Sequence, residues 1–328
     1  MNEINASFAT TVAPPNNVAR SAEWPIAKCF VFAWLIALAV VFVDCVWLYE
    51  TKYSIVPSSL SSGVAGSASI ACMALVMRRL FRLPRYSPLA AKLHATEICA
   101  ITESVGLLIV FSYSALLLQD LCISLAPPLV DDTLIAIDAM LGFSWSSIPV
   151  WCGKHPQMHM LLDYIYNSFE WQILFIAIFL GATKRFEDLY KFTILFFVCT
   201  VASIVISAPI PASNPFFHFG LVQHYEDSFW SQFFPIREGT ITSFDLGKGQ
   251  GLVSMPSLHA AGAVVFAYAL RNVKLVFPLS VAFNVTMTFS AIVCGAHYLV
   301  DIIAGIILAM ASIAVLEYIR NSHTSNLT

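Results

Sequence analysis

The feature that most constrains this sequence is a series of apolar runs, each close to the length that a helix needs to cross a lipid bilayer. Such a helix takes about 20 mostly apolar residues. Of the 328 residues, 58% are hydrophobic and only 11% are charged, whereas soluble domains carry about 25% charged residues. We therefore expect an all-α integral membrane protein, a polytopic helical bundle of about eight transmembrane helices. The runs place these helices at 28–49, 59–80, 97–125, 159–182, 189–208, 256–271, 275–294 and 297–319.

The runs divide the chain into four parts. Residues 1–25 are polar and predict a flexible cytoplasmic tail, 26–125 hold the first three helices, 126–320 hold the others, and 321–328 form a short second tail. The apolar run from Cys29 is longer than the core of a signal peptide, and no small-residue cleavage site follows it. We expect this run to remain as the first span.

The distribution of charge predicts the orientation of the bundle. A net charge of −3 excludes the broad basic surface that nucleic-acid binding requires. With the N-terminus in the cytoplasm, thirteen Lys and Arg residues fall on the inner side and four on the outer side, namely Lys52, Lys154, Arg237 and Lys248. By the positive-inside rule both termini are then cytoplasmic, and the loops 126–158 and 209–255 face the periplasm or a lumen. Within the first loop, Leu134–Val150 predicts an interfacial helix that walls a pocket.

The cysteines and paired histidines give no sign of a metal or disulfide framework. Eight cysteines are scattered, mostly within apolar runs and without a CxxC pair, as is typical of small core-facing or lipid-facing residues. His155 and His159 have the spacing of zinc ligands on a helix, but Pro156 interrupts any helix there and no third ligand stands out. We expect neither a metal nor a cofactor.

Chemistry is concentrated between Ser254 and Asp301. His259 follows Pro256 and Ser257 at the start of one apolar run, and His297 starts another, four residues before Asp301. On a helix, residues four apart share a face, so Asp301 can orient the imidazole of His297. The predicted helix that starts at His259 runs inward and the next one runs back outward to His297. Both histidines are therefore expected at the same outer interface. A helix start near Pro256 would also offer free backbone N–H groups to an anion. This pattern indicates phosphoryl transfer with a histidine nucleophile.

The motifs Pro256-Ser257-Leu258-His259 and Gly295-Ala296-His297-Tyr298-Leu299-Val300-Asp301 resemble two signatures of the type 2 phosphatidic acid phosphatase superfamily. The likeness is closer to its inositol-phosphotransferase branch, typified by inositol phosphorylceramide synthase, and covers roughly residues 130–320. It implies a six-helix phosphatase-type catalytic core within 126–320. It also implies that His297 attacks phosphorus, that Asp301 holds its other ring nitrogen and that His259 protonates the leaving oxygen. Ser257 and nearby amides would hold the phosphate oxygens.

The chain departs from the phosphatase form of this family by lacking its cations. Ala291 stands where that form has an arginine, and the segment 207–215, where its first motif should fall, contains no basic residue. The transferase branch resembles this chain in lacking these basic residues. Arg237 and Lys248 are the cations of the adjacent outer loop and are our candidates for neutralising the phosphate.

Two further residues open the fourth predicted span on the outer side. Asp163 and Tyr166 are candidates to line the headgroup pocket, although tyrosine at this level is ordinarily an interface residue.

The sequence thus predicts a membrane enzyme that transfers a phosphate or a phosphorylated headgroup of a lipid, with an alcohol as a possible acceptor. The alternative enzyme is a phosphatase of lipid phosphates or isoprenyl diphosphates, which differs only in using water as the acceptor. A member of a different class would be a non-catalytic membrane transporter. Its expected signature of two matching halves with broken helices is not visible in the sequence.

Overall fold

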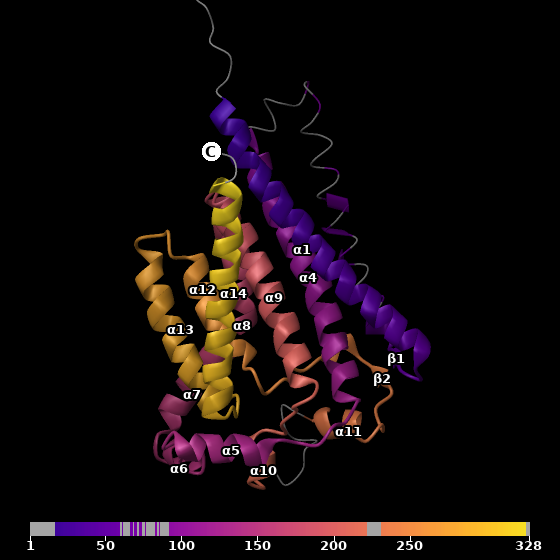
Figure 1. Ribbon diagram of the computed structural model, residues 1–328, viewed down its shortest axis with the longest axis vertical. Helices are drawn as coiled ribbons and strands as arrows, with labels where there is room; N and C mark the ends of the chain where they lie inside the picture. The colour runs from indigo at the N-terminus through magenta and orange to yellow at the C-terminus, as the bar shows by residue number, and fades with distance from the viewer. Residues whose placement is uncertain are drawn as a thin grey trace, which may run out of the picture.

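A computed structural model of the chain describes residues 17–59, 92–221 and 231–325, with scattered positions between 60 and 91. The described part is a bundle of helices (Figure 1). The long helices are α1 (Asn17–Glu50), α4 (Ala95–Ile123), α8 (Phe169–Ala182), α9 (Phe186–Ser207), α12 (Leu258–Ala269), α13 (Val276–Val293) and α14 (Leu299–Ser325). The shorter ones are α5 (Asp131–Met140), α6 (Ser147–Lys154), α7 (Pro156–Tyr166), α10 (Pro215–His218), α11 (Phe233–Arg237) and the 3-10 turn η3 (Leu246–Lys248).

Five of the described helices are long and apolar enough to cross a membrane, and α7 with α8 makes a sixth if this bent pair is one span. The five segments are Val31–Glu50, Ala95–Ile123, Phe186–Ser207, Val276–Val293 and Leu299–Ser322. Helix α12 is apolar but shorter, and the predicted run 59–80 lies largely outside the described residues. The prediction of an all-α polytopic membrane bundle is confirmed.

The predicted span 159–182 is bent by 46° where α7 meets α8. Two polar side chains sit at this bend and bond to backbone carbonyls of the preceding turn. Asn167 Nδ2 donates to the carbonyl of Asp163 at 2.8 Å, and Ser168 Oγ donates to that of Ile165 at 2.6 Å. Such side chains offer the backbone an alternative to continued helical bonding, which explains a break within an apolar run.

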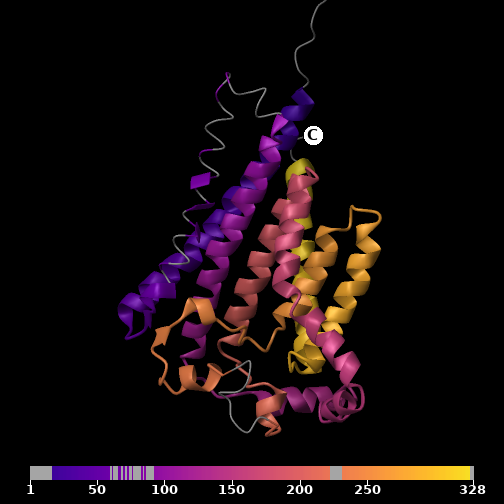
Figure 2. The same ribbon diagram turned by 180° about the vertical axis from the view of Figure 1, so that it is seen from behind.

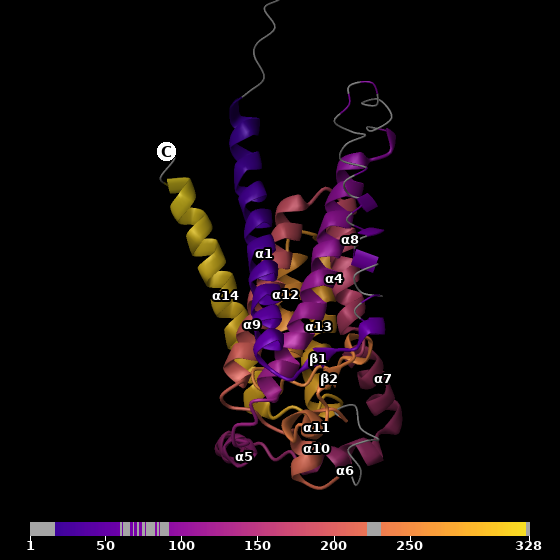
Figure 3. The same ribbon diagram turned by 90° about the vertical axis from the view of Figure 1, so that its right-hand side faces the viewer.

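Helices α5 and α6 lie across one end of the bundle, roughly perpendicular to the long helices (Figures 1 and 3). The prediction of a single interfacial helix over Leu134–Val150 is wrong, because α5 ends before Gly142, whose φ is 75°. The N–H of Gly142 bonds to the carbonyl of Ala139, and that of Phe143 to the carbonyl of Asp138. This is the Schellman arrangement, which terminates a helix at a left-handed residue.

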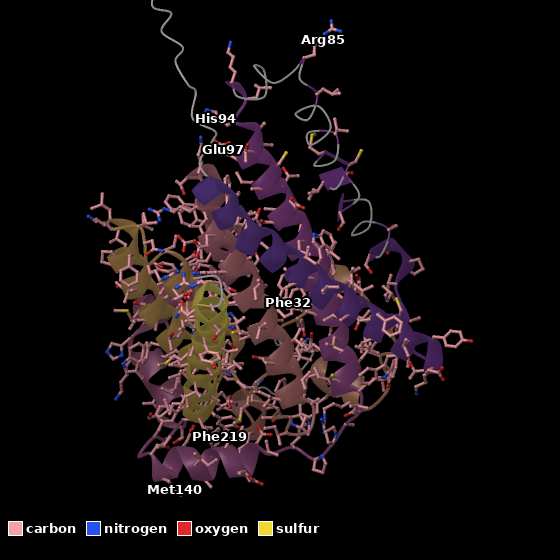
Figure 4. All side chains as sticks on the ribbon, turned by 45° about the horizontal axis from the view of Figure 1, so that its top comes forward. Phe32, Arg85, His94, Glu97, Met140 and Phe219 are labelled. Carbon is pink, nitrogen blue, oxygen red and sulfur yellow. The ribbon has the colours of Figure 1, made fainter. Side chains whose placement is uncertain are left out.

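The start of α1 and the end of α14 both lie at the other end of the bundle, which we call the terminal end (Figures 1 and 3). Figure 4 shows His94 and Glu97 toward this end, with Met140 and Phe219 at the α5 end. At the terminal end, buried Lys191 of α9 forms ion pairs with Glu187 at 2.9 Å and with Glu317 of α14 at 3.0 Å. The Tyr268 hydroxyl of α12 also donates to Glu317. This network joins α9, α12 and α14.

The core between these helices is closely packed. Aromatic side chains of α4, α9 and α12 fill its centre, including Phe111, Phe197 and Phe266. Gly305 of α14 lies against α12 so closely that an added Cβ would stand 2.3 Å from the carbonyl oxygen of Ser257. Only glycine permits this approach, which brings the starts of α12 and α14 together.

The segment between α9 and α12 returns along the α5 end, as the orange residues from 231 show from behind (Figure 2). It pairs in parallel with the residues after α1: Ser54 opposes Ser243 and Ile55 opposes Phe244 in strands β1 (Ser54–Ile55) and β2 (Ser243–Phe244). Tyr53 stacks on Phe244 beside this pairing, with ring centroids 5.4 Å apart. The segment is therefore attached to the N-terminal helices before it enters α12.

Candidate active site

His297 lies in the loop just before α14, with its imidazole beside the carboxylate of Asp301. The Nδ1 atom is 3.4 Å from Asp301 Oδ2, and the two side chains are 3% and 0% exposed. The sequence predicted that both residues share a helix. Instead, α14 begins at Leu299, because Ala296 adopts a left-handed φ of 50° and the backbone turns before the helix starts. The predicted contact forms nonetheless. It is an ion-pair distance, and Nδ1 has no hydrogen-bond partner within the described part of the chain.

Asp301 is held in place by groups from the segment that precedes α12 and by the residue that precedes α14. Ser254 Oγ donates to Asp301 Oδ2 at 2.8 Å, and the N–H of Tyr298 donates to the same oxygen at 3.0 Å. The N–H of Ser257 donates to the carbonyl of Asp301, also at 3.0 Å. The two sequence motifs are thus joined by hydrogen bonds. Sequence reasoning gave Ser254 no role, because nothing local marks which distant carboxylate it bonds to.

His259 is the second residue of α12 and lies beside His297, with 6.4 Å between the ring centroids. Its ring stacks on Tyr166 at 4.1 Å and contacts Phe169 at 4.5 Å between centroids. The structure therefore brings together His259, His297 and Asp301. Tyr166, predicted to line the pocket, is part of it, whereas Asp163 is exposed one turn earlier and does not line it.

Ser257 occupies the N-cap of α12 and is fully buried. Its Oγ accepts the N–H of Ala260 at 3.4 Å, as capping residues do at the first turn of a helix. Ser257 is not among the residues that line the cavity beside the histidines. Its predicted contact with phosphate stays a prediction.

A cavity of about 260 Å³ opens beside the two histidines. Its apolar wall comes from α4, α8, α9 and the segment before α12, and contains Phe111, Ala115, Leu116, Phe169, Ile173, Phe196, Ile204 and Val253. Its polar lining, apart from the histidines, contains Ser112, Gln119, Asn167, Glu170, Thr200 and Ser203. An apolar cavity with a few convergent polar groups is the usual form of a small-molecule site.

Gln119 of α4 fixes one wall of this cavity. Its Nε2 donates to the carbonyl of Gln250 at 2.8 Å, and its Oε1 accepts the N–H of Leu252 at 2.9 Å. Gly249, Gly251 and Val253 of the same segment line the cavity. A buried amide that both donates to and accepts from one backbone segment holds it as a neighbouring strand would.

The two cations nominated from the sequence lie away from the cavity. Arg237 Nη2 donates to the carbonyl of Pro127 at 2.6 Å, and its guanidinium lies 5.5 Å from the centroid of the Phe233 ring. Burial lowers the pKa of Arg237. The Lys248 side chain is 79% exposed, and its Nζ is 3.9 Å from Asp245. Among the described residues that line the cavity there is neither Lys nor Arg.

Two buried carboxylates of α5 contact the residues that follow His297. Asp138 accepts the N–H groups of Leu299 and Val300, both at 2.9 Å. Burial raises the pKa of Asp138, and these two donors oppose the rise. Asp131 accepts the hydroxyl of Tyr298 at 2.7 Å. Sequence reasoning placed both aspartates in the outer loop without a function, since their partners lie more than 160 residues away.

The described residues contain no group of three or more His, Cys, Asp or Glu arranged to hold a metal ion. In the same part of the chain, seven cysteines have free thiols.

A family model of the PAP2 superfamily, the type 2 phosphatidic acid phosphatases, matches residues 132–315, more than half of the chain. The chain belongs to the PAP2 superfamily. The PAP2 match begins in α5 and ends in α14, so it includes His259, His297 and Asp301 but not α4. No curated protein and no solved structure matches the chain. Membership of the PAP2 superfamily supports a lipid enzyme of the phosphatase or phosphotransferase type.

Proposed function

We propose that this protein transfers a phosphate or a phosphorylated headgroup from a lipid to an alcohol through a phosphohistidine intermediate on His297. The observation that carries the proposal is that His297 and His259 both line one cavity, with the buried carboxylate of Asp301 beside His297. His297 Nδ1 faces Asp301, which leaves Nε2 as the nitrogen available for attack. Imidazole is a competent nucleophile and base near neutral pH.

The reaction divides into two displacements at phosphorus. In the first, a P–N bond forms to His297 Nε2 while the P–O bond to the leaving alcohol breaks, and the imidazolium of His259 gives its proton to the leaving oxygen. In the second, His259 takes the proton of the acceptor hydroxyl, whose oxygen attacks phosphorus as the P–N bond breaks. Asp301 stabilises the positive charge that develops on the His297 ring. The acid and the base of the two steps are therefore the same residue.

Transfer is favoured over hydrolysis of phosphate monoesters by the charge of the cavity. A monoester carries a charge of about −1.5 to −2 at pH 7, because its second pKa is about 6. A phosphodiester carries a single negative charge, which one imidazolium can balance. The charged group among the described lining residues, besides the histidines, is the carboxylate of Glu170, and Ala291 stands where the phosphatase form has an arginine. This supports the inositol-phosphotransferase branch, with a phosphodiester lipid as donor.

The size of the cavity agrees with a lipid that enters only in part. Sites for drug-sized ligands are usually about 300–1,000 Å³, so a cavity of about 260 Å³ takes a headgroup and the first part of a chain. The rest of the lipid would stay in the bilayer. Tyr166 would then contact the headgroup, because it lines the cavity and stacks on His259.

The test uses the full chain in vesicles with a phospholipid radiolabelled in its headgroup phosphate, with and without inositol or a ceramide as acceptor. We expect base-stable, acid-labile label on the protein, its absence in His297→Ala, and a labelled product that depends on the acceptor. Release of inorganic phosphate from phosphatidic acid, with no acceptor dependence, would show the alternative, a lipid phosphatase. A chain that never carries label yet moves lipid between leaflets would belong to the transporter class.

We also propose that the α5 end faces the periplasm or a lumen and that both termini are cytoplasmic. In support, the connection from α8 into the start of α9, the turn between α12 and α13, and the end of α14 lie toward the terminal end (Figure 1). These segments contain Lys184, Arg185, Lys191, Arg271, Lys274 and Arg320, and the positive-inside rule places such residues on the inner side. Cysteines introduced singly at Lys154 and Lys274, in a variant whose native cysteines are replaced by serine, provide the test. A membrane-impermeant thiol reagent should label Lys154→Cys in intact cells and Lys274→Cys only after permeabilisation; the reverse pattern would invert the orientation.

A further inference from the structure

Helix α5 supplies the N-terminal cap of α14, the helix that follows His297. The first N–H groups of a helix have no partner within it and must be satisfied from outside. In α14 the carboxylate of Asp138 takes two of them, with Oδ2 accepting from Leu299 and Oδ1 from Val300. The residue before the helix is Tyr298, whose side chain cannot cap its own helix. A residue of another helix does so instead.

A second carboxylate of α5 holds Tyr298 itself. Asp131 lies seven residues before Asp138, about two helical turns away on the same face. Its Oδ1 accepts the Tyr298 hydroxyl at 2.7 Å, and its carboxylate also accepts the N–H and the hydroxyl of Ser213. The Tyr298 side chain is fully buried, so this bond is shielded from water. Each of the three residues after His297 is therefore bonded to α5.

The residues before His297 show why such a clamp matters. Ala296 has a φ of 50°, a conformation that residues other than Gly, Asn and Asp seldom adopt. Gly295 is tightly enclosed, since an added Cβ would lie 2.6 Å from Tyr166 Cε2. A residue other than glycine keeps such a left-handed backbone conformation only where contacts with the surrounding structure hold it there. His297 thus stands in a turn whose two sides are fixed by different parts of the protein.

We propose that Asp131 and Asp138 are positioning residues that set the location of the His297 imidazole. The proposal rests on the proposed role of His297 as nucleophile. Neither aspartate lines the cavity, so neither is expected to touch the lipid or the reacting atoms. Asp138 acts through the backbone N–H groups of Leu299 and Val300, and Asp131 acts through the Tyr298 hydroxyl. Helix α5 then positions His297 through Asp131 and Asp138, although nothing in its own sequence marks these two residues.

The experiment compares Asp138→Ala, Asp138→Asn, Asp131→Asn and Tyr298→Phe in lipid nanodiscs with the radiolabelled donor. The matched control is Asp132→Asn, whose side chain is 97% exposed on the same helix. Because a misplacement of about 1 Å can cost about 100-fold in rate, we expect Asp138→Ala to lower kcat by about 10- to 100-fold. KM should stay within about threefold, since lipid binding is unchanged. Asp138→Asn keeps one acceptor oxygen and should fall between Asp138→Ala and the wild type. Asp132→Asn should match the wild type.

A second readout does not depend on knowing the substrate. In protein with isotope-labelled histidine, the ring-nitrogen signals of His297 should move in Asp138→Ala and Tyr298→Phe and stay in place in Asp132→Asn. Wild-type protein that transfers no phosphate would overturn the proposed function, while these signals would still decide the positioning role. An active wild type, with kcat within about twofold in Asp138→Ala and Tyr298→Phe and unmoved signals, would overturn the inference. If Asp138→Ala does not fold, Tyr298→Phe decides, because it removes one hydroxyl and leaves the packing intact.

Discussion

Replacing Ser254 with alanine isolates one bond in the buried chain of contacts that ends at His297. The Ser254 hydroxyl donates to Asp301 Oδ2 at 2.8 Å, and both residues are fully buried. A hydrogen bond to a charged group contributes about 1.5–3 kcal/mol, and leaving the acceptor short of a donor costs a similar amount. We expect Ser254→Ala to lower the free energy of unfolding by about that much.

The effect on catalysis should be smaller than the full value of the bond. In Ser254→Ala, Asp301 Oδ2 still accepts the N–H of Tyr298 at 3.0 Å. The carboxylate therefore loses one of these two hydrogen bonds and keeps the other. We therefore expect the lower end of the range, about 1.5 kcal/mol, which is about a tenfold slower attack by His297. The assay is rapid-quench measurement of phosphoenzyme formation with the radiolabelled donor, because this step isolates attack from acceptor binding and product release.

The matched control is Ser104→Ala. Ser104 is another fully buried serine, on α4, and its hydroxyl has no hydrogen-bond partner within the described residues. It does not line the cavity. This variant should form phosphoenzyme at the wild-type rate. If Ser254→Ala also does, or if Ser254→Ala and Asp301→Asn are strictly additive in a double-mutant cycle, then Ser254 does not orient Asp301 and the reasoning fails.

Three further predictions address the rest of the site. Asp301→Asn should lower kcat by about 10- to 100-fold and leave more activity than His297→Ala, since it disturbs the partner of the nucleophile and not the attacking atom; equal losses in steady-state assays would contradict this. EDTA should leave turnover unchanged, because the imidazole supplies the nucleophile without a metal; recovery of an EDTA-treated sample only on adding a divalent cation would refute the scheme. Lys248→Ala should change kcat/KM by less than about twofold, because the ammonium is exposed beside Asp245; a larger loss would return Lys248 to the phosphate-neutralising role predicted from the sequence.

The long helices could be predicted from the sequence because their signal is local. Runs such as 189–208 and 275–294 are long and apolar, and α9 and α13 form there with ends shifted by only a few residues. The breaks were harder to place. Gly142 ends α5 and Ala296 delays α14, and both depend on left-handed backbone that an apolar pattern does not report.

The histidines and Asp301 were found because their spacing carries a chemical pattern. Ser254, Asp138 and Gln119 were missed because each acts on a partner far along the chain: Asp301, Leu299 and Leu252, respectively. A serine, an aspartate or a glutamine is common in outer loops and helix ends, so its type alone indicates nothing. Only the folded structure shows which of these residues bonds to a residue of the candidate site.

The residues that line the cavity come from both sides of the point where the PAP2 match begins, at residue 132. Phe111, Ala115, Leu116 and Gln119 come from α4, before the part of the chain that the PAP2 model matches, while both histidines come from within it. A protein cut at residue 126 would keep His259, His297 and Asp301 and lose the side of the cavity that α4 provides. The wall of the cavity is thus shared between α4 and the later helices, whereas the two histidines come from the later stretch alone. Exchanging α4 between relatives would alter one wall of the cavity and leave both histidines in place.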